Sequence, residues 1–514
     1  MGVTEQKRLK ILSEDELEAI YSRPHFTNEE RSNYFSLSQP EKELLQTLRS
    51  IKSQVYFVLQ LEYFKAKHQF FTFDLHEVME DLQYVLEQHF DNSKIADLNQ
   101  INRFTRLKQQ YLILELFDYC DCDAKERQKI MLRAHKTVAV CSKPVYIFRE
   151  IIYYLHEQRI VAPGYSSMQK MVSEALTYEQ NRLTAIMQDH LKQSDIEALK
   201  QLLEDSPGLY EITQLRREPK DFSVSEIKRE IDRCKKIQPL YQIIQRLLPK
   251  LNISNESVKY YSSLVDYYSV YKLKRLNKWI VYVYLLCFIY HHYQQAHDNL
   301  IETLIYNIRR FVDETKFTAK ERVYECYTEN NQNMKKAGQV LKIFTDNSIA
   351  TNTPFQDIQA RAFSILERKK LMTVADQIAS DAKFDETAFQ WEHVDKLARS
   401  FKRHLRPILL MVDFVSSLTN DPLVEAINFM KLAFIKNRPL GQYPPNILPS
   451  QFISDSIKRY LYRQNVDEQK TLLVDRYEFL VYHLLRNSLE AGDIFCREGI
   501  RFRSLEDDLL DEQQ

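Results

Sequence analysis

Glycine is scarce in this chain, and its scarcity narrows the possible folds. The 514 residues include only 7 glycines, whereas 31 tyrosines and 28 phenylalanines are present. Tight hairpin turns, β-bulges and phosphate-cradling loops all depend on glycine, and neither G-x-G-x-x-G nor G-x-x-x-x-G-K-[ST] occurs. The chain is therefore expected to be almost entirely helical, and nucleotide-binding enzymes of the usual kinds are disfavoured.

An excess of charge, paired cysteines and a long apolar run are also lacking. Lys plus Arg and Asp plus Glu both number 71, so the net charge is zero, although DNA binding needs only a local basic patch. Seven cysteines without disulfide or metal spacing predict reduced thiols in the cytoplasm. The longest apolar run, Trp279 to Tyr290, has 12 residues, fewer than the roughly 17–25 that span a bilayer. No membrane association is expected, and the N-terminus lacks the apolar core of a signal peptide.

Signals for helix starts are frequent. A Ser or Thr followed three residues later by Glu forms a capping box, and such boxes occur at Ser13–Glu16, Thr27–Glu30 and Ser38–Glu41. The third box, with Pro40 in its first turn, predicts one long helix through Lys65. Apolar spacing predicts further helices at residues 74–90, 98–117, 124–138, 144–158, 166–190, 223–248 and 475–489.

Two polar stretches and one short β-element complete the expected layout. Residues 204–221 are interpreted as a linker and residues 330–353, with several Asn and Thr, as a second junction. Residues 494–496 and 500–502 flank Glu498-Gly499, a pattern typical of a small β-hairpin. We therefore predict an all-α protein with several consecutive helical domains, a helix-turn-helix-like unit, and at most a small β-hairpin near the C-terminus.

The stretch from Tyr260 to Leu300 is the most distinctive in the chain. A ladder of tyrosines leads to the basic cluster Lys272, Lys274 and Arg275, then to an apolar run and to Asp298-Asn299-Leu300. This order resembles a segment of the Tn-three family transposases, the large replicative transposases of bacterial unit transposons. Four further blocks resemble the same family in the same order, at residues 12–37, 159–175, 405–438 and 477–510.

The resemblance implies what this chain contains and what it lacks. In the family, an Asp-Asp-Glu triad on an RNase-H-like sheet holds two metal ions that cut and join DNA, and that domain is expected after Leu510. The chain therefore resembles the DNA-recognition half of such a transposase, truncated before the catalytic domain and inactive alone. No catalytic residue is assigned, and no cofactor is expected in this chain, because a divalent metal such as magnesium belongs to the missing domain.

The resemblance also implies domains and partners. The double-stranded DNA of the transposon's terminal inverted repeats is the expected partner, together with a second copy of the chain or a separate catalytic half. The expected domains are an N-terminal helical DNA-binding domain (1–165), a long helix and linker (166–221), an aromatic-rich helical domain (222–330) and a helical domain leading to the catalytic one (331–514).

The helices on either side of Pro163 form the first candidate DNA contact. Helix-turn-helix proteins present the N-terminal residues of their second helix to base edges. The candidates here are Arg159 in the connection and, at the second helix, Tyr165, Ser166, Ser167, Gln169 and Lys170. An ordinary capped helical hairpin is the alternative, favoured by a connection longer than the motif's usual three or four residues.

Two further basic clusters are candidates. Arg103, Arg106 and Lys108 lie on one predicted helix, where a solvated amphipathic face explains them equally well. Lys272, Lys274 and Arg275 accompany a second set of residues, Tyr267, Tyr268 and Tyr271, that could help to grip a DNA backbone. Tyrosines at this density are more often core residues with their hydroxyls at the rim, and that interpretation is preferred.

Two other functions remain open. The chain could be a helical protein–protein interaction scaffold or an inactive remnant of a transposase, or one half of a transposase split over two reading frames. A metal site is disfavoured, because the histidines have no carboxylate or cysteine partners at ligand spacing; those considered are His135, His190, His291 and His292.

Overall fold

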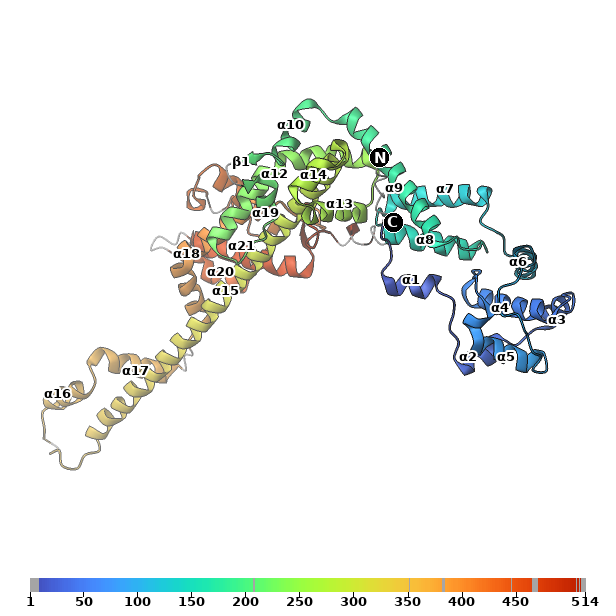
Figure 1. Cartoon of the computed structure of the whole chain (residues 1–514). Coiled ribbons are helices and arrows are strands. Elements are labelled where there is room, and N and C mark those ends of the chain that lie inside the picture. The colour runs from blue at the N-terminus through green and yellow to red at the C-terminus, as the bar shows by residue number, and fades with distance from the viewer. Residues whose placement is uncertain are drawn as a thin grey trace. The chain divides into compact units, whose positions relative to one another are not determined.

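The described chain is helical almost throughout. The computed structural model describes residues 9–206, 209–350, 352–380, 384–444, 446–464, 470–504, 506, 507 and 509. Within them, the structure has helices α1 to α21 and three sheets of only two strands each (Figure 1). This confirms the predicted all-α class. Contacts divide the chain into two compact units: Met1–Tyr210 with Gln242–Ile289, and Glu211–Tyr241 with Tyr290–Gln514. The four-domain division stays a prediction.

The first unit begins with short capped helices. These are α1 (Glu14–Tyr21), α2 (Asn28–Tyr34), α3 (Gln39–Gln46), α4 (Ile51–Lys67), a 3-10 turn (Leu75–Val78) and α5 (Met79–His89). The capping boxes predicted at Ser13, Thr27 and Ser38 are present. The prediction of a single helix through Lys65 is wrong, because the helix is interrupted between α3 and α4. Ser50 causes the new start, since its hydroxyl accepts the Ser53 N–H at 3.2 Å and caps α4.

The rest of the first unit includes α9, the longest helix that lies wholly within this unit. It comprises α6 (Arg103–Phe117), α7 (Ala124–Val140), α8 (Pro144–Glu157), α9 (Tyr165–His190), α10 (Gln193–Gln201), α13 (Asn255–Tyr267) and α14 (Val270–Arg275). Helices α7, α8 and α9 share one apolar core that includes Ile147, Ile151, Met168 and Val172. The linker predicted at residues 204–221 includes a strand pair, β1 (Asp205–Ser206) with β2 (Leu209–Tyr210), and then α11 (Glu211–Leu215).

Helices α12 (Val224–Leu251) and α15 (Lys278–Ile343) contribute residues to both units. Helix α15 has 66 residues and continues past residue 330, so the junction predicted at 330–353 begins only after Ile343. Its distal part packs against α16 (Phe355–Ile365) and α17 (Arg368–Ser380) through Ala337, Val340, Ala362, Leu366 and Val374. The apolar face here outweighs the local Asn and Thr content that suggested a break.

The remainder of the second unit alternates helices with short strands. Its elements are α18 (Glu386–Met411), β3 (Phe414–Ser416), α19 (Pro422–Ile435), a 3-10 turn (Leu440–Gln442), α20 (Asp455–Leu461), β4 (Tyr462–Gln464), β5 (Lys470–Leu472), α21 (Val474–Ala491) and β6 (Ile494–Cys496). Strand β4 pairs with β5, and β3 pairs with β6. Helix α21 ends at Gly492, whose φ of 82° permits the left-handed cap.

The strand predicted at residues 494–496 is present as β6, and its ladder partner is β3. One backbone hydrogen bond, from the Cys496 N–H to the Phe502 carbonyl at 2.6 Å, also joins it to residues 500–502. The buried carboxylate of Asp298 on α15 also holds residues 500–502. It accepts the backbone N–H groups of Ile500 at 3.0 Å, Arg501 at 3.0 Å and Phe502 at 3.4 Å. A Cβ on Gly499 would lie 2.8 Å from that carboxylate, so glycine is needed for the close approach. The buried Asp298 side chain thus links α15 to the loop at residues 500–502 and not to another helix.

Candidate nucleic-acid interface

The helix pair around Pro163 is present in the structure. Helix α8 ends at Glu157 and α9 begins at Tyr165, and the connection is held to the segment that follows α6. The Cys120 N–H donates to the Arg159 carbonyl at 3.0 Å, and the Val161 N–H donates to the Cys120 carbonyl at 3.0 Å. Arg159 has a φ of 52° and pairs with Asp118 at 3.3 Å. The connection is therefore a fixed part of the first unit.

Most candidates at the start of α9 hold the protein's own chain. The Tyr165 hydroxyl accepts the Ile11 and Leu12 N–H groups at 3.2 and 3.3 Å. Ser167 accepts a hydrogen bond from Arg127 at 2.6 Å. The Gln169 side chain donates to the Leu9 carbonyl at 2.8 Å. These contacts give the three side chains structural roles, and DNA contact by them stays a prediction.

Lys170 and Ser166 differ from these neighbours because both are exposed. The Lys170 side chain is 76% exposed, and its ion pair with Glu174 is long, at 3.8 Å. An exposed ion pair of this kind contributes little and is readily exchanged for another anion. Lys170 is therefore the α9 candidate most available to DNA.

The cluster on α6 combines cations with exposed apolar side chains. Arg103 and Lys108 are exposed, whereas Arg106 is partly buried and donates to Gln100 at 2.8 Å. Phe104 and Tyr111, which the sequence interpretation did not single out, are 77% and 63% exposed. Exposed rings among cations suit either a nucleic acid or another protein.

The cluster on α14 lies entirely at the surface. Lys272, Lys274 and Arg275 are exposed, and each cation lies over a tyrosine ring. The distances to the ring centroids are 3.5 Å from Lys272 to Tyr268, 5.0 Å from Lys274 to Tyr210 and 4.3 Å from Arg275 to Tyr271. Across the described ranges, no carboxylate forms an ion pair with any of the three cations. Their charges are thus free to attract an anion.

The tyrosines of this stretch divide into two groups. Tyr261 and Tyr284 are buried, as the core interpretation predicts, and they stack at 5.3 Å. Tyr267 and Tyr271 are 82% and 65% exposed, so the core interpretation fails for both. Both exposed tyrosines lie where α13 turns into the short helix α14. We call this turn, residues 267–275, the α14 corner.

Sequence reasoning missed two cations that belong near this corner. Lys200, in α10, and Lys278, the first residue of α15, line the same cavity as Lys274. No local sequence signal identifies Lys200, because 74 residues separate it from Lys274 along the chain. For Lys278 the signal was present, since it follows the basic cluster by only three residues.

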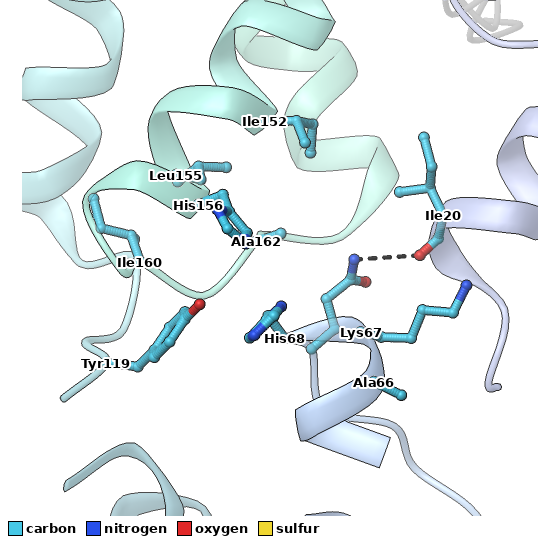
Figure 2. Close-up of a pocket in the computed structure, with 11 residues that line it drawn as sticks. Ile20, Ala66, Lys67, His68, Tyr119, Ile152, Leu155, His156, Ile160 and Ala162 are labelled. Carbon is cyan, nitrogen blue, oxygen red and sulfur yellow. Dashed lines mark hydrogen bonds between the residues drawn. The ribbon is translucent and has the colours of Figure 1, made fainter. Parts of the chain in front are cut away.

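A second cavity, of about 200 Å³, lies in the first unit between α1, α4 and α8 (Figure 2). Its polar groups are mostly occupied, because Lys67 donates to the Ala19 carbonyl and Gln69 to the Ile20 carbonyl. The ring of His68 lies 5.2 Å from that of Tyr119 and 5.3 Å from that of His156. Burial lowers the pKa of His68, and the nearby His156 lowers it further. Protonation of His68 is therefore expected to weaken the packing around this cavity.

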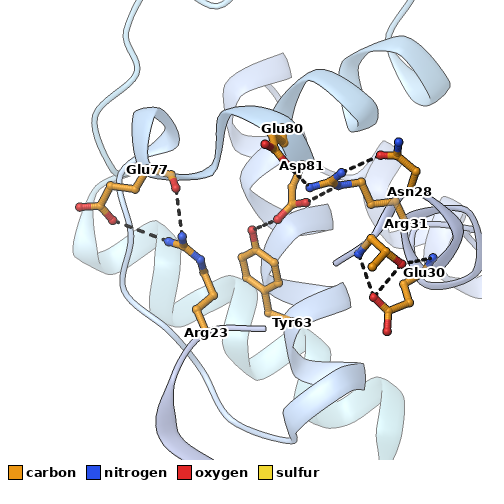
Figure 3. A network of polar contacts seen from close by, with 9 residues as sticks. Arg23, Asn28, Glu30, Arg31, Tyr63, Glu77, Glu80 and Asp81 are labelled. Carbon is orange, nitrogen blue, oxygen red and sulfur yellow. Dashed lines mark hydrogen bonds and ion pairs between the residues drawn. The ribbon is translucent and has the colours of Figure 1, made fainter. Parts of the chain in front are cut away.

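The N-terminal helices beside this cavity are fixed by a buried charge network (Figure 3). Arg31 of α2 donates to Asp81 of α5 at 2.8 Å, and Tyr63 of α4 donates to the same carboxylate at 2.7 Å. Arg31 also reaches Glu80 at 2.5 Å and Asn28 at 2.9 Å. Removing one partner of such a buried pair costs about 3–5 kcal/mol. The network thus connects α2, α4 and α5 to one another.

The histidines considered for metal binding have other partners. His135 stacks on Tyr178 at 3.9 Å, and the Nδ1 atom of His292 lies 2.7 Å from Arg233. Among the residues that the structure describes, only Asp74, His76 and Glu77 form a cluster of three potential ligands. Both carboxylates already accept hydrogen bonds from the local backbone: Asp74 accepts the Gln100 N–H at 2.8 Å and Glu77 accepts the Asp74 N–H at 3.3 Å.

In the parts of the chain that are described, no helix meets the length and apolarity needed for a membrane span.

Comparisons with known proteins place the candidate surfaces in context. Residues 11–175 match the model of a family described as a domain of unknown function, DUF4158. The chain is also similar to a curated protein of Enterococcus faecium, the transposase for transposon Tn1546, with 20% identity over 488 residues. That match covers 93% of this chain and 48% of the relative, so the chain spans about half the length of the curated relative it matches. The DUF4158 region holds the α6 cluster and the start of α9, whereas the α14 corner lies outside it.

Proposed function

We propose that this chain recognises DNA in transposition by binding the terminal inverted repeats of a transposon. One observation carries the proposal: the exposed α14 corner, where Lys272, Lys274 and Arg275 have no carboxylate partner in the described structure and lie beside exposed tyrosines. The similarity to a transposase supports it.

The proposed division of work follows from the two kinds of surface. Phosphate contacts position a protein on DNA, and base contacts specify the sequence. The cations of the α14 corner would hold phosphates. Lys170 and Ser166 at the start of α9, together with Arg103 and Lys108 on α6, would lie closer to the bases and their flanking phosphates.

The chain is proposed to supply recognition and not strand cleavage. An RNase-H-like catalytic domain needs a sheet of several strands, and the described residues form only two-stranded sheets. A divalent metal and the Asp-Asp-Glu triad would therefore come from another domain or chain, and a second copy of this chain could pair the two transposon ends.

Salt-dependent binding tests the proposal. The chain is titrated against the terminal repeat of its own element and against a scrambled duplex of the same length and composition. Each phosphate neutralised adds about 0.9 to the slope of log affinity against log salt. A steep slope with a clear preference for the repeat is expected, and equal weak binding to both duplexes would contradict end recognition.

A helical protein-interaction scaffold is the second candidate function. The observation that favours it is exposed apolar area on α6 and on the distal part of α15, where Phe104, Phe317 and Tyr324 are 77%, 63% and 74% exposed. The two functions separate in the same experiment, because a scaffold binds neither duplex preferentially.

A further inference from the structure

A cavity of about 240 Å³ lies in the first unit where α10, α14 and α15 meet. Three lysines line it, one from each helix: Lys200, Lys274 and Lys278. We call this feature the lysine pocket. Its floor is apolar and includes Leu203, Leu273 and Tyr282, which are 8%, 0% and 4% exposed. Lysine stems can lie along such a floor while the ammonium groups stay at the rim in contact with water.

The charge of the lysine pocket is unbalanced. Among the residues that the structure describes, Glu204 is the one acidic residue that lines it. No described carboxylate lies within ion-pair distance of Lys200, Lys274 or Lys278, whereas the buried Arg31 and the partly buried Arg182 each have a carboxylate partner. Three like charges around one hollow repel one another and create a positive potential there. A bound anion would relieve this repulsion.

The surroundings of the pocket extend the same potential. Lys272 and Arg275 lie on α14 beside Lys274 and also lack described carboxylate partners. The pocket borders the N-terminus of α15, the positive end of a 66-residue helix. This helix end adds to the charge of the lysines and is not the basis of the site. An extended polyanion with regularly spaced charges fits five cations along one corner better than a single small anion does.

We propose that the lysine pocket is a phosphate-anchoring site that holds a phosphodiester of the bound DNA backbone, with Lys272 and Arg275 contacting adjacent phosphates. The proposal rests on the proposed function and names the surface that provides sequence-independent affinity. Lysine binds phosphate as a point charge without strict geometry. The pocket therefore anchors any duplex equally, and the preference for the repeat arises elsewhere on the chain.

The first test is a triple variant of the full chain, Lys200→Gln, Lys274→Gln and Lys278→Gln. The affinity for the repeat and for the scrambled duplex should fall by a similar factor, about tenfold or more, and the salt slope should decrease by about 1 to 3. A matched control is Lys335→Gln, Lys336→Gln and Lys458→Gln, which removes the same charge from exposed lysines of the second unit. Its salt slope should remain that of the unmodified chain.

A second readout reports on the pocket itself. The Lys278 ammonium lies 5.0 Å from the ring centroid of Trp279. The chain has only 2 tryptophans, so Trp391→Phe leaves Trp279 as the single reporter. Adding duplex should change the Trp279 fluorescence, and the lysine-pocket variant should lose that change. Melting followed by circular dichroism should give the same midpoint for both, because the three lysines are exposed.

The outcomes separate the proposals. If the chain binds DNA but the triple variant keeps the same affinity, salt slope and Trp279 response, the lysine pocket is overturned while the proposed function stands. If inorganic phosphate changes the Trp279 fluorescence at constant ionic strength but duplex does not, the pocket takes a free anion and the phosphodiester assignment is overturned. If neither duplex binds, the proposed function fails first, and the anchoring role fails with it.

Discussion

The start of α9 and the α14 corner carry similar residue types, but their side chains are differently engaged. At α9, Tyr165, Ser167 and Gln169 are bonded to residues near the N-terminus or on α7. At the corner, the cations of Lys272 and Arg275 lie over tyrosine rings, and no carboxylate of the described residues pairs with them. A polar residue can serve a ligand only when the fold has not already used it. The comparison therefore moves the main DNA-binding candidate from the helix pair to the corner.

Charge reversal at the corner should have the largest effect. In the variant Lys272→Glu, Lys274→Glu and Arg275→Glu, attraction to phosphates becomes repulsion, so affinity for both duplexes should fall by about 100-fold or more at low salt. Fluorescence anisotropy of labelled duplexes measures this. The matched control is Lys335→Glu, Lys336→Glu and Lys458→Glu in the second unit. Equal losses in the two variants would show that only net charge matters and would remove the special role of the corner.

Removing one hydroxyl at the start of α9 should affect stability more than binding. Tyr165→Phe leaves the buried Ile11 and Leu12 N–H groups without their acceptor, which costs about 1–3 kcal/mol. Thermal unfolding should show a midpoint several degrees lower, while the folded variant binds the repeat within about twofold of the original. Tyr178→Phe, on the same helix, is the control and should melt as the original does. A large loss of affinity without a change in melting would instead place the Tyr165 hydroxyl on DNA.

Lys170 should have a smaller, sequence-dependent effect. Lys170→Ala removes the exposed cation at the start of α9 and should lower affinity for the repeat by about tenfold, the size of one good specific contact. Affinity for the scrambled duplex should fall only about two- to threefold. The complementary variant Glu174→Gln removes the ion-pair partner of Lys170 and should raise affinity slightly. Equal losses on both duplexes in Lys170→Ala would make Lys170 a phosphate contact like the corner cations.

The smallest expected effect is on the stability of the first unit in acid, to which His68 contributes. His68 titrates near pH 6.5 in the unfolded chain, and burial next to His156 lowers its pKa in the folded state. The unfolded chain therefore binds more protons, so stability is full above the unfolded pKa and is lost as pH falls through the folded pKa.

The variant His68→Gln removes this contribution. Its melting temperature should fall less than that of the original between about pH 7.5 and about pH 5, by roughly 1–3 °C. His76→Gln, at an exposed position in the same unit, serves as the control. An unchanged pH dependence in His68→Gln would place the acid sensitivity elsewhere.

Local signals explain why much of the fold was predictable. The capping boxes at Ser13, Thr27 and Ser38 depend on residues three apart, and each was found where the sequence places it. The hydrogen bonds that hold residues 500–502 were not predictable, because their acceptor is the carboxylate of Asp298, some 200 residues away along the chain. The break between α3 and α4 has a weaker signal, because Ser50 caps α4 but is followed three residues later by Ser53 and not by the Glu of a capping box.

The candidate site shows the same division. The basic cluster of α14 is visible in the sequence, since Lys272, Lys274 and Arg275 are adjacent. The lysine pocket is not, because three helices bring its members together. The engagement of Tyr165 by Ile11 and Leu12 was equally invisible, being a contact between residues more than 150 positions apart.

The most direct test of end recognition is the salt titration of the full chain on the terminal repeat and on the scrambled duplex. Specific DNA-binding proteins prefer their sites by about 10³-fold or more. A preference of that size, with a salt slope that the lysine-pocket variant reduces equally on both duplexes, is the predicted result. Weak and equal binding to the two duplexes, or none, would contradict the proposed role in recognising transposon ends.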